Sequence, residues 1–119
     1  MKKILVAEDD TFLSKVFEAK LTKEGYEVMV VSDGTLVLEN LVSFSPDFIL
    51  LDIMMPKMNG FEVLEELQRR GVTTPIVVTS NLGQIEDRQK AIALGAKDFL
   101  VKSDNGIQQI VERIKQFLS

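Results

Sequence analysis

The sequence predicts a doubly wound α/β domain, with a five-stranded parallel sheet covered by helices on both faces. Short apolar runs alternate along the chain with stretches whose apolar residues recur at helical spacing. Repeated β-then-α units of this length require parallel strands joined by helical crossovers. The run 48–52 is also continuously apolar up to its final aspartate. Such a run is typical of a strand buried on both faces of a sheet.

The first half of the chain supplies three of the expected strands. We place them at residues 4–7, 26–31 and 48–52, each a short apolar run. A helix follows the first strand, because apolar residues recur there at helical spacing until Gly25 ends the pattern. A weaker helical pattern covers residues 35–44 and leads into the third strand.

The second half supplies two more strands and three helices. We expect helices at residues 60–70, 85–94 and 107–118, and strands at 76–79 and 99–101. The last helix carries the clearest apolar stripe of the chain, which indicates one face packed on the sheet. The alternation of strand and helix is therefore unbroken from one end to the other.

Length and composition predict one domain, spanning residues 1–119, with 45% hydrophobic residues to form a core. The sequence contains neither cysteine nor histidine. That composition excludes a disulfide framework, a thiolate nucleophile and the usual zinc ligands. Any metal must be held by oxygen atoms, which favours magnesium, calcium or manganese.

The charge balance limits the partners. A net charge of −4 and a pI near 4.8 disfavour direct binding to nucleic acid or to an acidic membrane. The apolar run near the amino terminus, residues 4–7, is too short for a signal peptide, and no run approaches the length of a membrane span. We expect a cytoplasmic protein.

Polar residues collect where the predicted strands end. Because the carboxyl ends of parallel strands meet at one rim of the sheet, these side chains should lie together. Carboxylates this close would repel one another, and a divalent cation relieves the repulsion. With a hydroxyl and an ammonium beside them, the set fits phosphoryl transfer, in which positioning and charge neutralisation dominate. The residues are Glu8, Asp9, Asp10, Asp52, Thr79, Ser80 and Lys102.

Each of these residues also has a plainer interpretation. Acids favour helix amino termini, which accounts for Asp10 and remains an alternative for Glu8 and Asp9. Thr79 suits a strand, and Lys102 alone would pass for a solvated loop lysine. An aspartate is a poor strand residue, so the run ending at residue 52 is the hardest to explain without a function. The joint occurrence favours a site.

The whole chain resembles the receiver domains of two-component response regulators. Four motifs carry the resemblance, and their order and spacing make it specific. They are the acidic pair Glu8-Asp9, the segment from Asp52 to Gly60 (Asp-Ile-Met-Met-Pro-Lys-Met-Asn-Gly), Thr79, and the segment from Gly95 to Lys102 (Gly-Ala-Lys-Asp-Phe-Leu-Val-Lys).

The resemblance implies a flavodoxin-like fold with strand order 2-1-3-4-5. It implies that Asp52 accepts a phosphoryl group from a phosphohistidine of a sensor histidine kinase or a His-phosphotransfer protein. Glu8, Asp9, Asp52 and the backbone carbonyl of Met54 would hold Mg²⁺, with Mn²⁺ as the alternative ion. The domain would then be a phosphoacceptor with slow self-dephosphorylation and not a turnover enzyme.

The resemblance also assigns the switch. Lys102 and Thr79 would bind the phosphoryl group, and Phe99 would follow Thr79, although an aromatic residue there equally suits a plain core position. Met54 and Asn81 would tune the lifetime of the phosphoryl group. The output would be a separate effector protein or a fused domain, and the domain itself a monomer or a weak, phosphorylation-dependent dimer.

One position departs from the family pattern. Receiver domains usually carry a proline after the lysine, often with a cis peptide bond, whereas Ser103 follows Lys102 here. A cis bond without proline costs about 3–4 kcal/mol. We therefore expect a rerouted loop, with Lys102 still reaching the site.

Two other functions compete with this interpretation. A phosphatase of the haloacid dehalogenase type also uses an aspartate at a strand end, but it needs a second acid two residues later, where this chain has Met54. An unphosphorylated pseudo-receiver acting as an interaction module is the remaining alternative. Such modules typically lose an acid, the nucleophile or the lysine, all of which are present.

Overall fold

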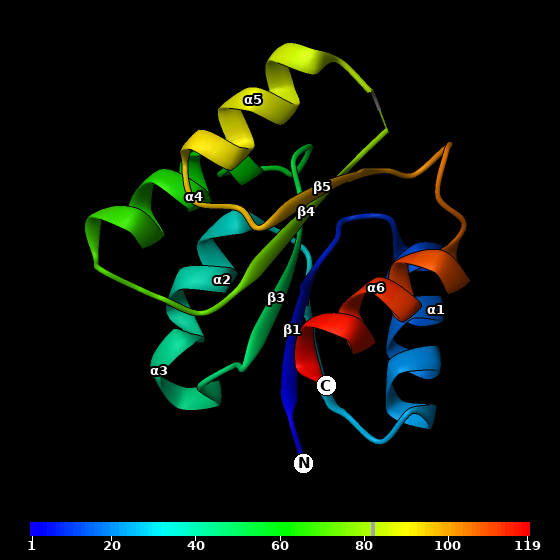
Figure 1. Ribbon diagram of the computed structural model, residues 1–119. Helices are drawn as coiled ribbons and strands as arrows, with labels where there is room; N and C mark the ends of the chain where they lie inside the picture. The colour runs from blue at the N-terminus through cyan, green and yellow to red at the C-terminus, as the bar shows by residue number, and fades with distance from the viewer. Residues whose placement is uncertain (82) are drawn as a thin grey trace.

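The computed structural model, which describes residues 1–81 and 83–119, contains a five-stranded parallel sheet (Figure 1). The strand order is β2-β1-β3-β4-β5, so the predicted doubly wound, flavodoxin-like arrangement is confirmed. The elements are β1 (Lys3–Ala7), α1 (Thr11–Lys23), β2 (Glu27–Val31), α2 (Gly34–Glu39), α3 (Leu41–Phe44), β3 (Phe48–Asp52), α4 (Gly60–Arg69), β4 (Ile76–Ser80), α5 (Ile85–Ala93), β5 (Asp98–Val101) and α6 (Ile107–Leu118).

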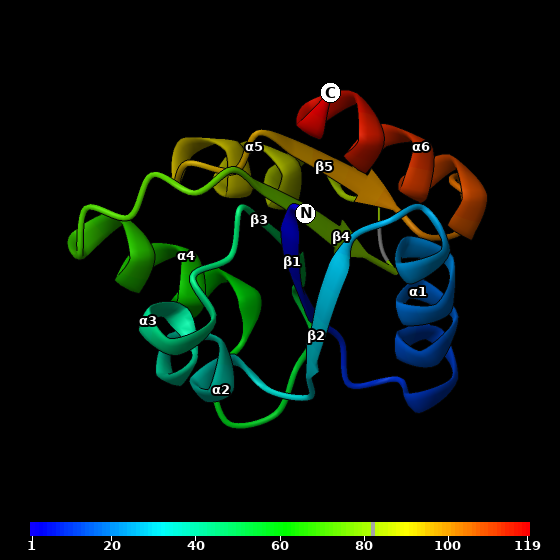
Figure 2. The same cartoon turned by 90° about the horizontal axis from the view of Figure 1, so that it is seen from below.

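Helices cover the sheet on both sides. Figure 2 shows α1 and α6 on one face, and α2, α3, α4 and α5 on the other. Alternate residues of β1 point to opposite faces, as expected for a strand. Ile4 and Val6 pack in the cluster with Phe17 and Ile110, whereas Leu5 packs in the cluster on the other side. The continuously apolar strands are therefore buried on both faces of the sheet.

The expectation of one helix over residues 35–44 was wrong in detail. Asn40 divides it into α2 and α3, with a backbone φ of −103° and ψ of 4°. The side-chain amide of Asn40 donates a hydrogen bond to the carbonyl of Leu36 at 2.8 Å. An asparagine that bonds to a nearby backbone carbonyl in this way competes with regular helix geometry, so the break has a local cause.

The sheet brings the carboxyl ends of β1, β3 and β4 side by side. Ala7 is in register with Leu51, and Asp52 is in register with Thr79. The ladder continues one residue beyond β3, because the N–H of Ile53 donates to the carbonyl of Thr79 at 3.1 Å. The position of Asp52 is therefore fixed by strands on both sides.

Of the helices in the described part of the chain, none combines the length and the hydropathy of a membrane span.

Burial of β3 should dominate the stability of the fold. Leu50 is 2% exposed and packs between the sheet and the pair α1 and α6. We expect Leu50→Ala to lower the free energy of unfolding in urea by about 3 kcal/mol with an unchanged m-value, because it leaves a cavity in the core. Val42→Ala removes an aliphatic side chain that is 91% exposed, and should change stability by less than about 0.5 kcal/mol. Similar losses for the two variants would contradict this account.

Candidate functional site

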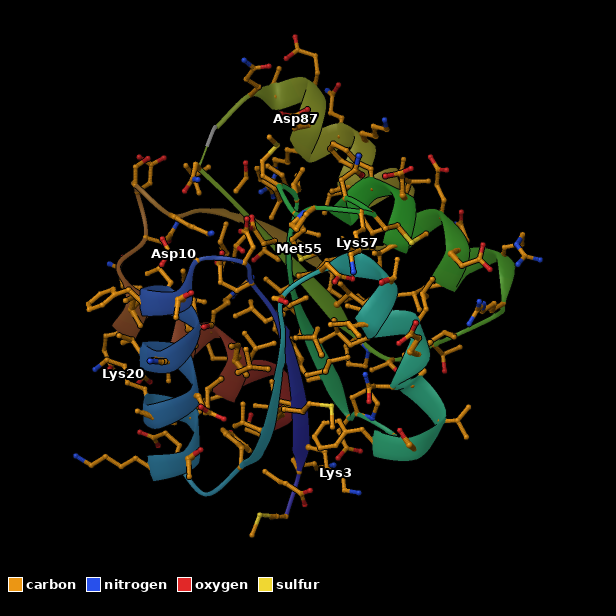
Figure 3. The ribbon with its side chains drawn as sticks, turned by 180° about the vertical axis from the view of Figure 1, so that it is seen from behind. Lys3, Asp10, Lys20, Met55, Lys57 and Asp87 are labelled. Carbon is orange, nitrogen blue, oxygen red and sulfur yellow. The ribbon has the colours of Figure 1, made fainter. Side chains whose placement is uncertain are left out.

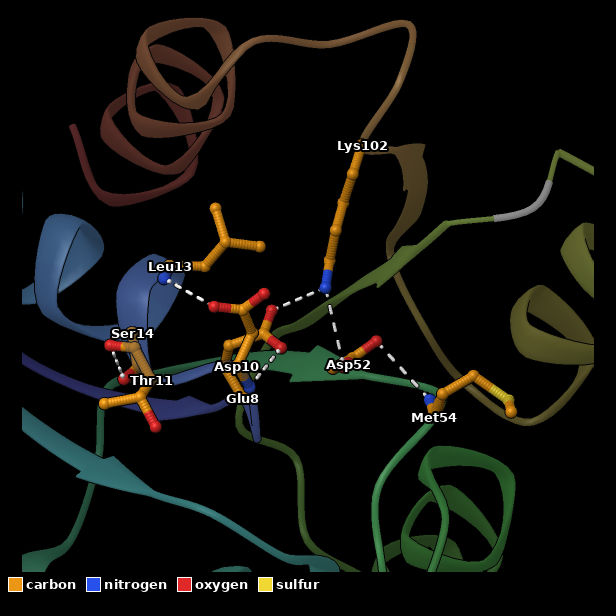
Figure 4. Close-up of polar contacts among 8 residues, drawn as sticks. All are labelled: Glu8, Asp10, Thr11, Leu13, Ser14, Asp52, Met54 and Lys102. Atoms are coloured by element: carbon orange, nitrogen blue, oxygen red, sulfur yellow. Dashed lines mark hydrogen bonds and ion pairs between the residues drawn. The ribbon is translucent and has the colours of Figure 1, made fainter.

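An acidic pocket of about 290 Å³ lies at the carboxyl ends of the central strands. It is lined by side chains from the loop after β1, the start of α1, the end of β3 and the loops after β3, β4 and β5. Figure 4 shows its core, where Lys102 extends toward Glu8 and Asp52. The lining residues are Glu8, Asp9, Asp10, Leu13, Asp52, Met54, Asn81 and Lys102.

The end of β1 and the first turn of α1 position the acids. Glu8 is only 3% exposed, and its N–H donates to the carbonyl of Val31 at 3.0 Å, which extends the pairing with β2. Asp10 is the N-cap of α1 and accepts a hydrogen bond from the N–H of Leu13 at 3.0 Å. The N–H of Asp10 donates in turn to the Glu8 carboxylate at 3.2 Å. The capping role predicted for Asp10 is confirmed.

Lys102 joins the two buried carboxylates. Its Nζ lies 2.5 Å from Oε1 of Glu8 and 3.4 Å from Oδ2 of Asp52. The strand β5 supports this reach, since the N–H of Lys102 donates to the carbonyl of Ser80 at 2.8 Å. The ammonium forms an ion pair with Asp52 and lies nearer still to Glu8. A bridging position satisfies both anions with one cation.

The loop after Lys102 follows a path suited to the serine. The peptide bond between Lys102 and Ser103 is trans. The carbonyl of Val101 accepts hydrogen bonds from the N–H of Asp104 at 3.1 Å and from the N–H and the side-chain amide of Asn105 at 2.9 Å and 3.1 Å. Sequence reasoning overlooked Asn105, although the run Ser-Asp-Asn-Gly after the lysine consists of turn-forming residues.

The carboxyl group of Asp52 has a higher pKa than an ordinary aspartate. Its side chain is 3% exposed, and burial raises its pKa to about 7, with further increase from the charge of Glu8 and opposition from Lys102. Two buried carboxylates therefore share one ammonium, and Asp9 adds a third, more exposed acid at the pocket. The site carries excess negative charge near neutral pH.

The acids also satisfy the simplest requirement for a metal site. Glu8, Asp9 and Asp52 each offer a carboxylate oxygen, and these atoms lie within 4.8 Å of one another. The donors are all oxygen, which suits a hard divalent cation such as Mg²⁺ or Mn²⁺. The chemistry of the set therefore fits the cation that the resemblance implied.

The segment of residues 53–59 contributes Met54 to the pocket and is held at both of its ends. Met54, 62% exposed at the pocket, donates its N–H to Oδ1 of Asp52 at 3.4 Å. At the far end, the N–H of Gly60 donates to the carbonyl of Ile53 at 2.8 Å. A Cβ on Gly60 would lie 2.7 Å from the carbonyl oxygen of Asp52, so this close backbone approach requires glycine.

Of the remaining predicted residues, one lines the pocket and two are buried beside it or farther away. Asn81 lines the pocket directly. Thr79 is 1% exposed and stands across from Asp52 in the sheet. Phe99 is 4% exposed and borders a separate cavity of about 280 Å³ beside α5 and β5, together with Arg88 and Val101. Arg88 donates to the carbonyl of Phe99 at 3.0 Å.

A flavodoxin-like sheet with an acidic pocket and a lysine at its carboxyl rim is the arrangement that the resemblance to receiver domains implied. The comparison with protein families agrees: the response regulator receiver domain model matches residues 4–115. The chain belongs to the response regulator receiver domain family.

Relatives and solved structures support this membership. The chain is 40% identical over 118 residues to the transcriptional regulatory protein CpxR of Klebsiella pneumoniae, covering 99% of this chain and 50% of CpxR. The receiver domain of Francisella response regulator 1452 superposes with a TM-score of 0.90 at 28% identity, covering 97% of this chain and 94% of that one. The Mn²⁺-bound form of response regulator Rcp1 has a TM-score of 0.84 at 26% identity, with 99% and 94% covered. The chain spans about half the length of CpxR.

The raised pKa of Asp52 makes stability depend on pH. Between the ordinary aspartate pKa of 3.8 and about 7, the folded protein binds more protons at Asp52 than the unfolded chain does. Stability contributed by this group is therefore complete below the lower value and is lost as pH rises through the window. Without added metal, Asp52→Asn should remove this slope and stabilise the protein more at pH 8 than at pH 5, by roughly 2–3 kcal/mol.

Chemical denaturation of the two proteins at a series of pH values measures this difference. Asp47→Asn is a matched control, because Asp47 stands just before β3 and is exposed. Parallel pH curves for wild type and Asp52→Asn would show that the carboxyl is not perturbed by its surroundings.

Proposed function

We propose that this domain is the phosphoacceptor of a two-component system, with Asp52 as the residue that is phosphorylated. The observation that carries the proposal is the arrangement around this carboxylate. Asp52 is 2% exposed at the floor of an open pocket, with an ammonium at 3.4 Å and two further acids beside it. Burying an unpaired aspartate carboxylate would cost folding free energy. The neighbours of Asp52 are instead the kinds of groups that bind a metal ion and a phosphoryl group.

The proposed step transfers a phosphoryl group from a phosphohistidine of a partner protein. A carboxylate oxygen of Asp52 attacks phosphorus, an O–P bond forms, and the N–P bond to the imidazole breaks. The bonding electron pair leaves with the imidazole nitrogen. The partner histidine is consistent with the absence of histidine from this chain. Later attack by water on phosphorus restores the carboxylate and releases inorganic phosphate.

Glu8, Asp9, Asp52 and the Met54 carbonyl are the groups that would hold Mg²⁺, or Mn²⁺ in its place. The bound ion would supply positive charge that balances the carboxylates and the incoming phosphoryl oxygens. The acids of the chain provide the oxygen donors, and the similarity to Rcp1, whose structure holds Mn²⁺, supports this assignment.

Side chains around Asp52 would then bind the phosphoryl group and change conformation in response. The Lys102 ammonium is close enough to turn from Glu8 toward oxygens placed on Asp52. Thr79, across from Asp52, would donate its hydroxyl to the phosphoryl group. Phe99 is near the Thr79 strand and beside a cavity, so a rotamer change there would carry the signal to the surface of α5 and β5.

The proposed partners follow from this chemistry. A sensor histidine kinase or a His-phosphotransfer protein would donate the phosphoryl group. A separate effector or an output domain elsewhere in the full protein would receive the signal, and the twofold length of CpxR, a transcriptional regulatory protein, leaves room for the second arrangement. In this role the domain undergoes one modification per signal and is not a turnover enzyme, and it would act in the cytoplasm.

Phosphorylation of the isolated domain is directly measurable. With Mg²⁺ and acetyl phosphate, we expect the intact protein to gain the mass of one phosphoryl group, because a small phosphodonor can enter the pocket. Asp52→Asn should abolish the gain, since an amide oxygen is a poor nucleophile. Asp47→Asn, which changes an exposed acid near the other end of the same strand, should label like the wild type.

The same experiment separates the rival function. A wild-type domain that binds Mg²⁺ but acquires no label would favour an interaction module that works without phosphorylation. Labelling that persists in Asp52→Asn would move the acceptor to another residue.

Met54 should prolong the phosphorylated state. Its side chain stands at the mouth of the pocket, 62% exposed, where a bulky apolar group hinders the attacking water. We expect Met54→Asn to dephosphorylate roughly fivefold faster, which corresponds to about 1 kcal/mol in the barrier. The decay of labelled protein after removal of acetyl phosphate gives the rate. Equal decay rates for the two proteins would contradict this role for Met54.

A further inference from the structure

The segment of residues 53–59, which places Met54 at the acidic pocket, also touches the start of α2. A Cβ built on Gly34, the first residue of α2, would lie 2.1 Å from the carbonyl oxygen of Met58 and 2.7 Å from Cγ2 of Val63. The first neighbour is backbone and cannot rotate away. Position 34 therefore has no room for a side chain, and glycine allows the helix backbone to pack directly against the segment.

Asp33 also connects the start of α2 to this segment. Asp33 is the N-cap of α2 and accepts hydrogen bonds from the N–H of Leu36 at 3.1 Å and from the hydroxyl of Thr35 at 2.5 Å. The other carboxylate oxygen of Asp33 lies 3.8 Å from Nζ of Lys57. Figure 3 shows Lys57 beside the start of α2. Lys57 has a backbone φ of 65°, so the turn at this point adopts a conformation that L residues rarely take.

We propose that Gly34 is a positioning residue for the phosphorylation site. By its close contact with Met58, it fixes the segment whose other end carries Met54 at the pocket. Met54 donates its N–H to Asp52 at 3.4 Å and lines the pocket, and Gly60 closes the segment against the backbone of Asp52. A side chain at position 34 would displace Met58 and, through this short segment, shift Met54 relative to Asp52. The inference rests on the proposed function.

The primary test measures Mg²⁺ affinity of folded Gly34→Ala by isothermal titration calorimetry. We expect about tenfold weaker binding than in the wild type, the size of effect found when the groups that orient metal ligands are disturbed. Labelling by acetyl phosphate at subsaturating Mg²⁺ should slow to a similar degree. Gly106→Ala is the matched control, because Gly106 is also at the start of a helix and its Cβ would have no atom within 4 Å. Wild-type Mg²⁺ affinity in Gly34→Ala would overturn the proposal.

A double-mutant comparison separates positioning from ordinary core packing. Val63→Ala removes the side-chain atom that a Cβ at position 34 would meet, but leaves the Met58 carbonyl in place. The loss of Mg²⁺ affinity caused by Gly34→Ala should persist when it is measured in the Val63→Ala background. Recovery of the affinity in that background would assign the effect to core packing and reject the positioning role.

A second pair of variants covers the case in which Gly34→Ala does not fold. Asp33→Ala and Asp33→Asn remove the same charge, but only asparagine keeps an oxygen for the helix cap. We expect weaker Mg²⁺ binding in Asp33→Ala than in Asp33→Asn, because only the former loosens the start of α2. Equal affinities in this pair would also reject the proposal.

Failure of the proposed function is distinguishable from failure of this inference. A wild-type protein that is never labelled on Asp52 would refute the phosphoacceptor role, while the Mg²⁺ affinities would still test Gly34. A labelled wild type with equally labelled and equally Mg²⁺-binding Gly34→Ala would refute only the positioning role.

Discussion

The structure depends most on the enforced proximity of Asp52 and Glu8. The two acids stand at the ends of adjacent strands, and the hydrogen-bond ladder of a parallel sheet does not allow the strands to separate when the acids repel. The fold therefore stabilises a charge arrangement that water would disperse. The raised pKa of Asp52, the inward reach of Lys102 and the suitability of the pocket for a divalent cation all follow from this constraint.

Much of the fold was predictable from the sequence because a parallel sheet covered on both faces leaves a strong signal. Continuous apolar runs such as 48–52 mark strands, and glycines end the helices between them. The break at Asn40 was not predictable, because the same apolar spacing suits one helix or two. Its cause is a single side-chain hydrogen bond, and periodicity does not register such a bond.

The composition of the site was predictable for a related reason. Acids, a hydroxyl residue and a lysine at strand ends must meet at one rim, so Glu8, Asp52 and Lys102 could be grouped before their distances were known. The supporting residues were harder to find. Asn105 shapes the loop that replaces the usual proline, and Gly34 makes a close contact with the segment that carries Met54, from a helix distant in sequence. The contribution of Gly34 is an absent side chain, which only the packed structure reveals.

The bridging position of Lys102 has a consequence for how the pocket exchanges ions. Lys102 directly follows the edge strand β5, and its ammonium reaches past β4 to Asp52 at the end of β3 and Glu8 just after β1, lying within 4 Å of both. The domain thus carries its own tethered counter-ion. In the proposed function, an incoming cation would therefore compete with a resident positive charge that cannot diffuse away, and the displaced ammonium would remain close to the phosphoryl oxygens.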